Sequence, residues 1–335
     1  MLLRDKKRLL ITGGAGFIGS CFIRYTLQKM DVEKLVNLDL LTYAGNLSSL
    51  VEVAKDPRYV FVQGDIVDAA LVEKLCTEHS IDTIVHFAAE SHVDRSIEDP
   101  LAFFETNVRG TLQLLEVVRR LPHIHFHHVS TDEVYGSLGP TGAFSESSAY
   151  KPNSPYAASK AASDHFVRAY AHTYGIFCTL SHSSNNFGPY QCEEKFIPHM
   201  ITRCLQGKTL PVYGSGKNIR DWLYVEDHVE ALWAILQKGK KGEVYDIGGG
   251  CEKSNIDLLQ EIIALVARYT GEDVELLSSY ITFVKDRPGH DFRYAIDSSK
   301  IKNELSFQPQ HDFSYALEKT VLWYIEKQQK VEAIS

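Results

Sequence analysis

The sequence of 335 residues lacks features that mark several protein classes. It has no apolar run near the roughly 18 residues that a membrane-spanning helix needs. Its basic residues do not outnumber its acidic ones: 35 Lys and Arg stand against 43 Asp and Glu, a formal net charge of −8. Nucleic acids and anionic membranes attract proteins with a positive excess, so we expect neither as a partner.

The sequence has no closely paired cysteines, and we expect no leader segment. The six cysteines are scattered and form no Cys-x-x-Cys pair, which favours free thiols in a reducing compartment. Residues 1–12 have neither the apolar region nor the small-residue cleavage site of a signal peptide. We therefore expect a cytoplasmic protein, and the length favours two domains.

Short apolar runs alternate with helix-length stretches through the first half of the chain. The predicted strands are Leu9–Thr12, Leu35–Asp39, Tyr59–Gln63, Thr83–Ala88, His125–Ser130 and Ile176–Leu180. The predicted helices between them are Phe17–Lys29, Ala69–His79, Ala102–Leu121 and Tyr156–Tyr174. Runs that are apolar at successive positions are typical of strands covered on both faces. The pattern predicts an α/β fold with a doubly wound parallel sheet, the Rossmann arrangement.

Turn signals become dense after Ser184, and helices there alternate with shorter strand-like pieces. We interpret residues 1–184 as a dinucleotide-binding domain and residues 185–335 as a smaller mixed substrate domain. Some later segments, such as Tyr245–Ile247, are expected to return to the first domain.

A glycine-rich loop follows the first predicted strand directly. Gly14, Gly16 and Gly19 fit the GxGxxG pattern, while Gly13, Gly16 and Gly19 fit the wider GxxGxxG spacing. Such glycines allow a tight turn and bring a pyrophosphate onto the N-terminus of the next helix. Asp39 ends the second strand, 20 residues past Gly19, where an acid accepts from a ribose 2′-hydroxyl. No Arg follows Asp39 directly to pair with a 2′-phosphate, so the sequence predicts NAD rather than NADP.

The ends of the next two strands extend this predicted cofactor site. Asp65 and Ile66 follow the third strand, where the adenine is expected. Ala88, Ala89, Glu90 and Ser91 end the fourth, where the nicotinamide half is expected.

A catalytic group is predicted at the end of the fifth strand and the start of the following helix. Thr131, Asp132 and Glu133 end the strand, and Tyr156 and Lys160 lie four residues apart on one face of the helix. A nearby ammonium favours the phenolate, so we expect a lowered pKa for Tyr156 and a role as base toward a sugar hydroxyl. Neighbouring carboxyls separate each other's pKa values, which leaves one acid and one base.

The YxxxK spacing alone does not select this tyrosine, because it occurs four times. The other pairs are Tyr25/Lys29, Tyr213/Lys217 and Tyr315/Lys319. Only Tyr156 begins the helix that follows the strand with Thr131–Glu133.

The histidines around the fifth strand suggest a metal at first sight. They are His123, His125, His127 and His128. No Cys or carboxylate follows at ligand spacing, so we predict structural histidines and no metal.

These motifs together resemble the extended short-chain dehydrogenase/reductases and, among them, the nucleotide-sugar 4,6-dehydratases. The Ser130–Gly136 segment carries the narrower resemblance, because related epimerases lack the Asp of its Asp-Glu pair. Further matching segments are Leu41–Leu47, Ala88–Ser96, Ser184–Gln191, Arg220–Asp227 and Asp286–Asp291. The resemblance covers almost the whole chain. It implies a lyase with tightly bound NAD that removes water from a nucleotide-linked glucose, and a homodimer formed through the helices 102–121 and 156–174.

The resemblance also implies ligand contacts beyond the motifs. The added NAD contacts are Phe17, Ile18, Leu40, Leu41, Thr42, Thr106 and Asn186, together with Tyr156 and Lys160. The implied sugar-nucleotide contacts are Ser91, Thr131, Asn185, Lys195, Phe196, Pro211, Val212, Tyr213, Arg220, Asn255, Asp286, Arg287, Pro288, Gly289 and His290. Among these, Lys195, Arg220, Arg287 and His290 supply the positive charge that a diphosphate needs within an acidic protein.

Two positions depart from the family pattern. The family more often carries an Arg within the segment Ser181–Ser183, and a Tyr in place of Phe187. The first departure puts a local contact in doubt and leaves the catalytic group complete.

The leading hypothesis is the removal of water from dTDP-glucose in deoxysugar biosynthesis. UDP-glucose is the closest alternative, since the two bases differ by one methyl group, worth about 1–3 kcal/mol in a pocket. A nucleotide-sugar 4-epimerase and a non-catalytic nucleotide-binding regulator are the others. An epimerase needs no acid directed at C6, and a regulator needs none of the titratable side chains.

Overall fold

The computed structural model describes residues 6–332. Residues 1–5, on which part of the expectation about a leader rests, and residues 333–335 of the predicted second domain lie outside them. No helix in the described range is long and apolar enough to cross a membrane.

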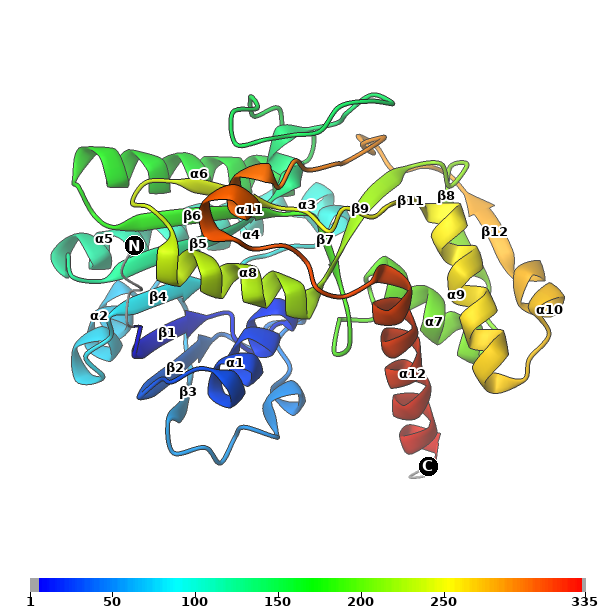
Figure 1. The fold of residues 1–335 in the computed structure, drawn as a ribbon, viewed down its shortest axis with the longest axis horizontal. Coiled ribbons are helices and arrows are strands. Elements are labelled where there is room, and N and C mark those ends of the chain that lie inside the picture. The colour runs from blue at the N-terminus through cyan, green and yellow to red at the C-terminus, as the bar shows by residue number, and fades with distance from the viewer. Residues whose placement is uncertain (1–5, 333–335) are drawn as a thin grey trace.

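Seven parallel strands form the main sheet, in the order β10-β6-β5-β4-β1-β2-β3 (Figure 1). Their bounds are β1 Arg8–Thr12, β2 Lys34–Asp39, β3 Tyr59–Gln63, β4 Thr83–His86, β5 His125–Thr131, β6 Cys178–Ser183 and β10 Val244–Ile247. The strand order reverses at β1, which lies between β2 and β4. Ligands of doubly wound sheets bind outside the carboxyl ends of the strands at such a reversal. The predicted fold class is confirmed.

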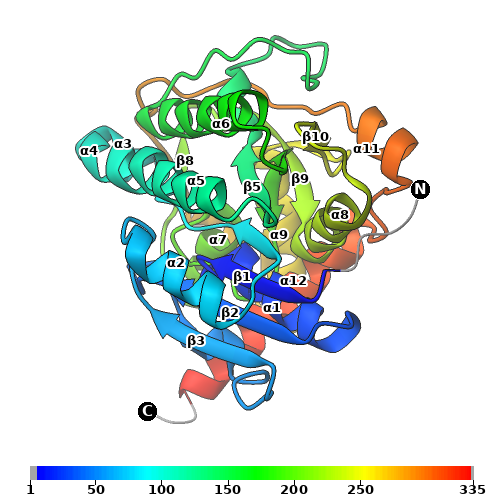
Figure 2. The same cartoon turned by 90° about the vertical axis from the view of Figure 1, so that its left-hand side faces the viewer.

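Helices cover both faces of this sheet (Figure 2). One face packs against α1 Phe17–Lys29, α8 Val225–Lys238 and α11 Ser299–Leu305. The other packs against α2 Ala69–Glu78, α5 Thr111–Arg120 and α6 Pro155–Thr173. Burial on both faces explains why the strands read as continuous apolar runs.

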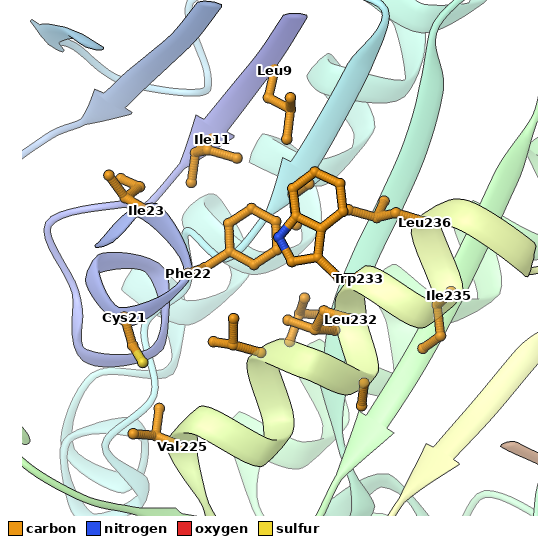
Figure 3. Close-up of a cluster of buried hydrophobic side chains, with 14 of the residues drawn as sticks. Leu9, Ile11, Cys21, Phe22, Ile23, Val225, Leu232, Trp233, Ile235 and Leu236 are labelled. Carbon is orange, nitrogen blue, oxygen red and sulfur yellow. The ribbon is translucent and has the colours of Figure 1, made fainter. Parts of the chain in front are cut away.

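An aromatic pair joins two helices that are distant in the sequence (Figure 3). Phe22 of α1 stacks on Trp233 of α8, with ring centroids 5.6 Å apart and planes 2° apart. The indole Nε1 of Trp233 donates to Thr26 Oγ1 at 3.0 Å. Because α8 comes after residue 184, the second half of the chain supplies part of the core beneath β1.

The remaining elements form a second cluster at the carboxyl edge of the sheet. Its helices are α7 Phe196–Leu205, α9 Asn255–Thr270, α10 Val274–Ser279 and α12 Phe313–Glu332. Its strands are β7 Asn185–Phe187, β8 Leu210–Tyr213, β9 Ile219–Tyr224, β11 Glu252–Ser254 and β12 Ile281–Val284, which form the small sheets β11-β9-β7 and β12-β8. The short elements of the first half are η1 Leu47–Leu50, α3 Val93–Glu98, α4 Pro100–Phe103, η2 Phe104–Gly110 and η3 Asp132–Tyr135.

Two element predictions need correction. The stretch predicted as one helix over 102–121 is divided into α4, η2 and α5, and η2 is a π-helix. The strand predicted at Ile176–Leu180 runs instead from Cys178 to Ser183. Its polar end was missed because Ser181 and His182 are buried through hydrogen bonds to other side chains rather than through apolar packing.

Gly19 is required where α1 meets β1. A Cβ at this position would lie 2.4 Å from Gly13 O and 2.9 Å from Gly14 Cα, closer than backbone atoms tolerate. Gly19→Ala should therefore lower the free energy of unfolding by about 1–3 kcal/mol, since overpacking outweighs the helix propensity of Ala. Urea denaturation measures this. Gly139→Ala is the control, because nothing lies within 4 Å of its Cβ, and an equal loss in both variants would contradict the argument.

Candidate active site

A cavity of about 680 Å³ opens at the carboxyl ends of the central strands. Its lining includes most of the predicted cofactor residues: Gly13, Gly16, Phe17, Ile18, Gly19, Asp39, Leu40, Thr42, Asp65, Ile66, Ala88, Ala89, Glu90, Ser91, Thr106 and Asn186. Leu41 does not line it; its backbone N–H instead donates to Asp39 Oδ1 at 2.8 Å. The five predicted catalytic residues line the same cavity.

The glycine loop is shaped for a ligand with phosphates. Gly13 has a φ of 71°, and a Cβ there would lie 2.5 Å from the backbone nitrogen of Ala88. Gly16 caps α1 without any side chain bonded to the first-turn amides, which leaves the positive end of the helix facing the cavity. Asp39 is buried beside the loop, and its Oδ2 accepts from the Ala15 amide at 2.8 Å. A helix N-terminus without a side-chain cap, next to a single carboxylate, fits a dinucleotide diphosphate and its ribose.

The π-helix η2 shapes the side of the cavity next to the end of β4. Asn107 is buried in it, and its side chain accepts from Glu90 N at 2.9 Å and donates to Glu90 O at 3.0 Å. It also donates to Ser159 Oγ of α6 at 2.8 Å. The irregular turn therefore fixes the loop after β4 against α6, and Thr106 beside it lines the cavity.

Two elements bring the catalytic residues together. β5 ends at Thr131, and η3 begins with Asp132 and Glu133. α6 begins with Pro155, after Ser154 caps it through Ala157 N, so that Tyr156 faces the strand end within its first turn. Tyr156 is hydrogen-bonded to Thr131.

The expected effect of Lys160 on Tyr156 is not found. Burial, followed by the charge of Glu133, raises the pKa of Tyr156 rather than lowering it. Lys160 instead directs its Nζ to Val129 O at 2.9 Å and lies 3.4 Å from His128 Nε2. Burial lowers the pKa of Lys160 itself to about 8, against the opposing charge of Asp164. For the buried phenol of Tyr156 to ionise, more positive charge is needed nearby than Lys160 alone supplies.

The two carboxyls have different surroundings. Burial, with the neighbouring Glu133 and Asp221, raises the pKa of Asp132 well above its usual value. Asp132 is 2% exposed, and its Oδ2 has no hydrogen-bond partner among the described residues. Burial also raises the pKa of Glu133, but Lys195 and Arg220 act to lower it. These surroundings favour Asp132 as the protonated carboxyl and hold Glu133 closer to its ionised form.

The predicted sugar-nucleotide residues form two groups. Ser91, Thr131, Asn185 and Lys195 line the cavity, and Lys195 Nζ donates to Ser91 O at 2.8 Å. The residues outside the lining are Phe196, Pro211, Val212, Tyr213, Arg220, Asn255, Asp286, Arg287, Pro288, Gly289 and His290.

Several members of the second group lie together on the far side of Glu133. The Arg287 guanidinium lies over the Tyr213 ring, 5.1 Å from its centroid. His290 Nδ1 lies 2.6 Å from Asp286 Oδ1. Arg220 and Arg287 both act to lower the pKa of Glu133.

The structure adds cavity residues that the sequence prediction did not include. They are Tyr43, Asn46, Ser48, Ser49, Tyr190, Gln191, Cys192, Glu193, Trp323 and Lys327, among others. Several belong to the matching segments Leu41–Leu47 and Ser184–Gln191, which were a usable signal. Trp323 and Lys327 lie on α12, far along the chain, and belong to no recognised sequence motif.

Comparison with known proteins places this geometry in a family. The profile of the GDP-mannose 4,6 dehydratase family matches residues 10–320. A dTDP-glucose 4,6-dehydratase of Xanthomonas campestris is 51% identical, over 97% of this chain and 95% of the relative.

Two solved structures of dTDP-glucose 4,6-dehydratases are also similar. That from Streptomyces venezuelae, with NAD and TYD bound, has a TM-score of 0.90 at 47% identity over 96% of this chain and 98% of its own. That from Bacillus anthracis, in complex with NAD, has a TM-score of 0.89 at 46% identity over the same shares.

Fold and cavity thus define a dinucleotide-dependent enzyme of the short-chain dehydrogenase/reductase class that acts on nucleotide sugars. Within that class, the chain belongs to the dTDP-glucose 4,6-dehydratase family. The resemblance found in the sequence is confirmed.

Tyr156→Phe should lower turnover about 10²–10⁴-fold, because the variant has no oxygen to accept a substrate proton. Substrate affinity should change little, since the ring still fills its place. Turnover and KM are measured on the purified protein. Tyr315→Phe is the matched control, with the same YxxxK spacing on the exposed side of α12. A crippled control beside a normal Tyr156→Phe would show that the wrong tyrosine was chosen.

Proposed function

We propose that the protein removes water from dTDP-glucose to give dTDP-4-keto-6-deoxyglucose, with NAD as a tightly bound cofactor. The observation that carries this proposal is the buried Asp132, whose Oδ2 finds no hydrogen-bond partner within residues 6–332, beside Glu133 and in one cavity with Tyr156. A protonated carboxyl without an internal partner is suited to giving a proton to a poor leaving group. A 4-epimerase does not require an acid directed at C6, and a non-catalytic regulator does not require Asp132, Glu133 and Tyr156 together.

The cofactor would be held by the glycine loop and by the residues at the ends of β2, β3 and β4. When bound, NAD supplies a hydride acceptor for C4, a hydride donor for C6 and, in its oxidised form, a positive charge. The relatives from Bacillus anthracis and Streptomyces venezuelae, both with NAD bound, support this choice.

The side chains of this protein move the protons. Tyr156 accepts the proton of the C4 hydroxyl, and the resulting ketone acidifies the hydrogen on C5. Glu133 removes that proton while Asp132 protonates the departing C6 hydroxyl, so that water leaves. Glu133 then returns a proton to C5. The roles of the two carboxyls follow the order of their pKa shifts, with the more deeply buried Asp132 as acid.

The positive side chains around Glu133 suit the diphosphate of a sugar nucleotide. Lys195 lines the cavity, and Arg220 and Arg287 act on the same carboxyl. An acidic protein of net charge −8 thereby offers a local cationic pocket. The nucleotide is tested directly: the protein is incubated with dTDP-glucose and UDP-glucose separately, without added cofactor. Mass spectrometry should find the loss of one water from dTDP-glucose, and dehydration of UDP-glucose alone would reassign the substrate.

We also propose a cytoplasmic homodimer that pairs through the stretch 102–121, which is divided into α4, η2 and α5, and through α6. Large apolar side chains are exposed on this side of the molecule: Ile97, Leu101, Phe104, Phe166 and Tyr174. Exposed apolar side chains gathered on neighbouring elements are typical of a surface covered by a partner.

Replacement of the two carboxyls should separate oxidation from elimination. Glu133→Gln cannot accept the C5 proton, yet it leaves Tyr156 in place. It should accumulate a 4-keto sugar that keeps its C6 oxygen, together with the absorbance of reduced nicotinamide. Asp132→Asn retains the shape but cannot donate a proton, and it should slow the same step. The measurement is absorbance on mixing, followed by the mass of the quenched sugar.

Tyr156→Phe serves as the control for this pair, because it should show neither the absorbance nor the ketone. Normal dehydration by Glu133→Gln would remove Glu133 from the proposed role. Formation of a C4 epimer alone by the parent protein would remove the dehydratase proposal itself.

The dimer is tested by Leu101→Asp, which places a charge on a side chain that is 73% exposed in the monomer. The parent should have the mass of a dimer in native mass spectrometry at micromolar concentration, and the variant should shift to monomer. Val51→Asp is the control, since Val51 is 67% exposed and lies outside the proposed interface. A monomeric parent would overturn the proposal.

A further inference from the structure

A buried charge cluster lies behind the catalytic residues, centred on His182 of β6. His182 Nε2 lies 3.1 Å from Asp164 Oδ2 of α6, and His182 Nδ1 lies 2.9 Å from Asp246 Oδ1 of β10. All three side chains are fully buried. Both ring nitrogens therefore face carboxylates, an arrangement that an imidazolium satisfies with two N–H donors.

The groups packed around the cluster support this charge. Tyr135 of η3 donates to Asp246 at 3.0 Å, and its hydroxyl lies 2.9 Å from His182 Nδ1. Tyr150 donates to Asp164 at 3.2 Å, and its hydroxyl lies 2.9 Å from His182 Nε2, so each phenol contacts one carboxylate and one ring nitrogen. Glu146 accepts from the backbone N–H of Asp246 at 2.9 Å, which adds another acid nearby.

His182 differs from the other buried histidines of the sheet. Burial acts to lower the pKa of His182, but the two carboxylates outweigh it and raise it to about 9. Burial, with the charge of Lys160, lowers the pKa of His128 to about 4, and burial lowers that of His127 to about 3. His182 is thus a cation that lies between two buried acids, while burial keeps His127 and His128 of β5 neutral.

The cluster reaches the catalytic residues through Asp164. This residue follows Lys160 by one turn of α6, and its charge supports the protonated form of Lys160. Asp164 Oδ2 accepts from Ser130 Oγ at 3.0 Å, next to Thr131 on β5. His128 lies between Lys160 and Asp164. Its Nε2 is 3.3 Å from Asp164 Oδ1 and 3.4 Å from Lys160 Nζ.

We propose that His182 is a positioning residue for the reaction. Its imidazolium, between Asp164 and Asp246, keeps Asp164 ionised. The ionised Asp164 in turn keeps Lys160 charged and α6 in register with β5. Without a cation at this position, two buried carboxylates share one site and one of them takes up a proton. Lys160 then loses its counter-charge and releases its proton at a lower pH. This inference rests on the proposed roles of Tyr156 and Lys160, and it assigns His182 no contact with substrate or cofactor.

The charge on His182 is tested by stability, independently of activity. A group whose pKa is raised on folding stabilises the protein fully below its unfolded pKa of about 6.5 and loses that effect as the pH rises through its folded pKa. The Tm of the parent should therefore fall between about pH 6.5 and about pH 9, relative to His182→Arg, whose guanidinium keeps its charge. Parallel curves of Tm against pH for the two proteins over this range would contradict the claim that His182 is protonated in the folded protein.

The positioning role is tested by the pH profile of turnover. His182→Gln should lower kcat at least tenfold at pH 8 with little change in KM. The alkaline limb of its plot of kcat against pH should move to lower pH. His182→Arg should restore kcat and the limb. His127→Gln is the matched control: it replaces a buried neutral histidine bonded to Thr179 and Ser181, and it should lower the Tm without moving the limb. An unmoved limb in His182→Gln would reduce His182 to a purely structural residue.

Asp246→Asn covers the case in which His182→Gln does not fold. It removes one carboxylate and leaves the Asp164–His182 pair, so the fall in Tm should begin at a lower pH than in the parent. An unchanged Tm profile would contradict the cluster as described. If the parent does not dehydrate the sugar at all, the proposed function fails, while the Tm comparison still decides whether His182 is charged.

Discussion

The hydrogen bond from Lys160 Nζ to Val129 O, at 2.9 Å, joins the two elements on which the site depends. It ties the first turns of α6 to the last residues of β5. Tyr156 comes one turn before this contact, and Asp132 and Glu133 come directly after the strand. The separation of the phenol from the two carboxyls is therefore set by the packing of a helix on a strand, rather than by a flexible loop. Catalytic groups held this way are preorganised at no further entropic cost.

Burial then divides the titratable groups of the site by function. It raises the pKa values of Asp132 and Glu133 and lowers that of Lys160, because each charged form loses its hydration. The nearby cations oppose this effect for Glu133 more than for Asp132. Two adjacent carboxyls of similar intrinsic acidity thus come to differ, through the distribution of Lys and Arg on the substrate side.

The sequence was sufficient for the parts of the fold that follow from local pattern. The glycine loop, Asp39 and the bounds of α1 and β3 are visible as spacing and apolar runs, and the family motifs identify most of the cavity. The polar end of β6 was not predictable, because His182 is buried by charge pairing with residues 18 and 64 positions away. The π-turn at η2 depends on Asn107 bonding to Glu90, and the direction of Lys160 depends on Val129 O, so neither has a signature in local sequence.

The position of β10 has a consequence for the order in which the protein is made. The strand enters the ribosome's exit tunnel some sixty residues after β6, beside which it must finally lie. During that interval β6 is the free edge of a six-stranded sheet, with its backbone groups open to pairing. The partner of His182 on that strand, Asp246, arrives at the same late moment. Closing the edge and completing the Asp164–His182–Asp246 cluster are thus one event, and a nascent chain that stalls before residue 247 lacks both.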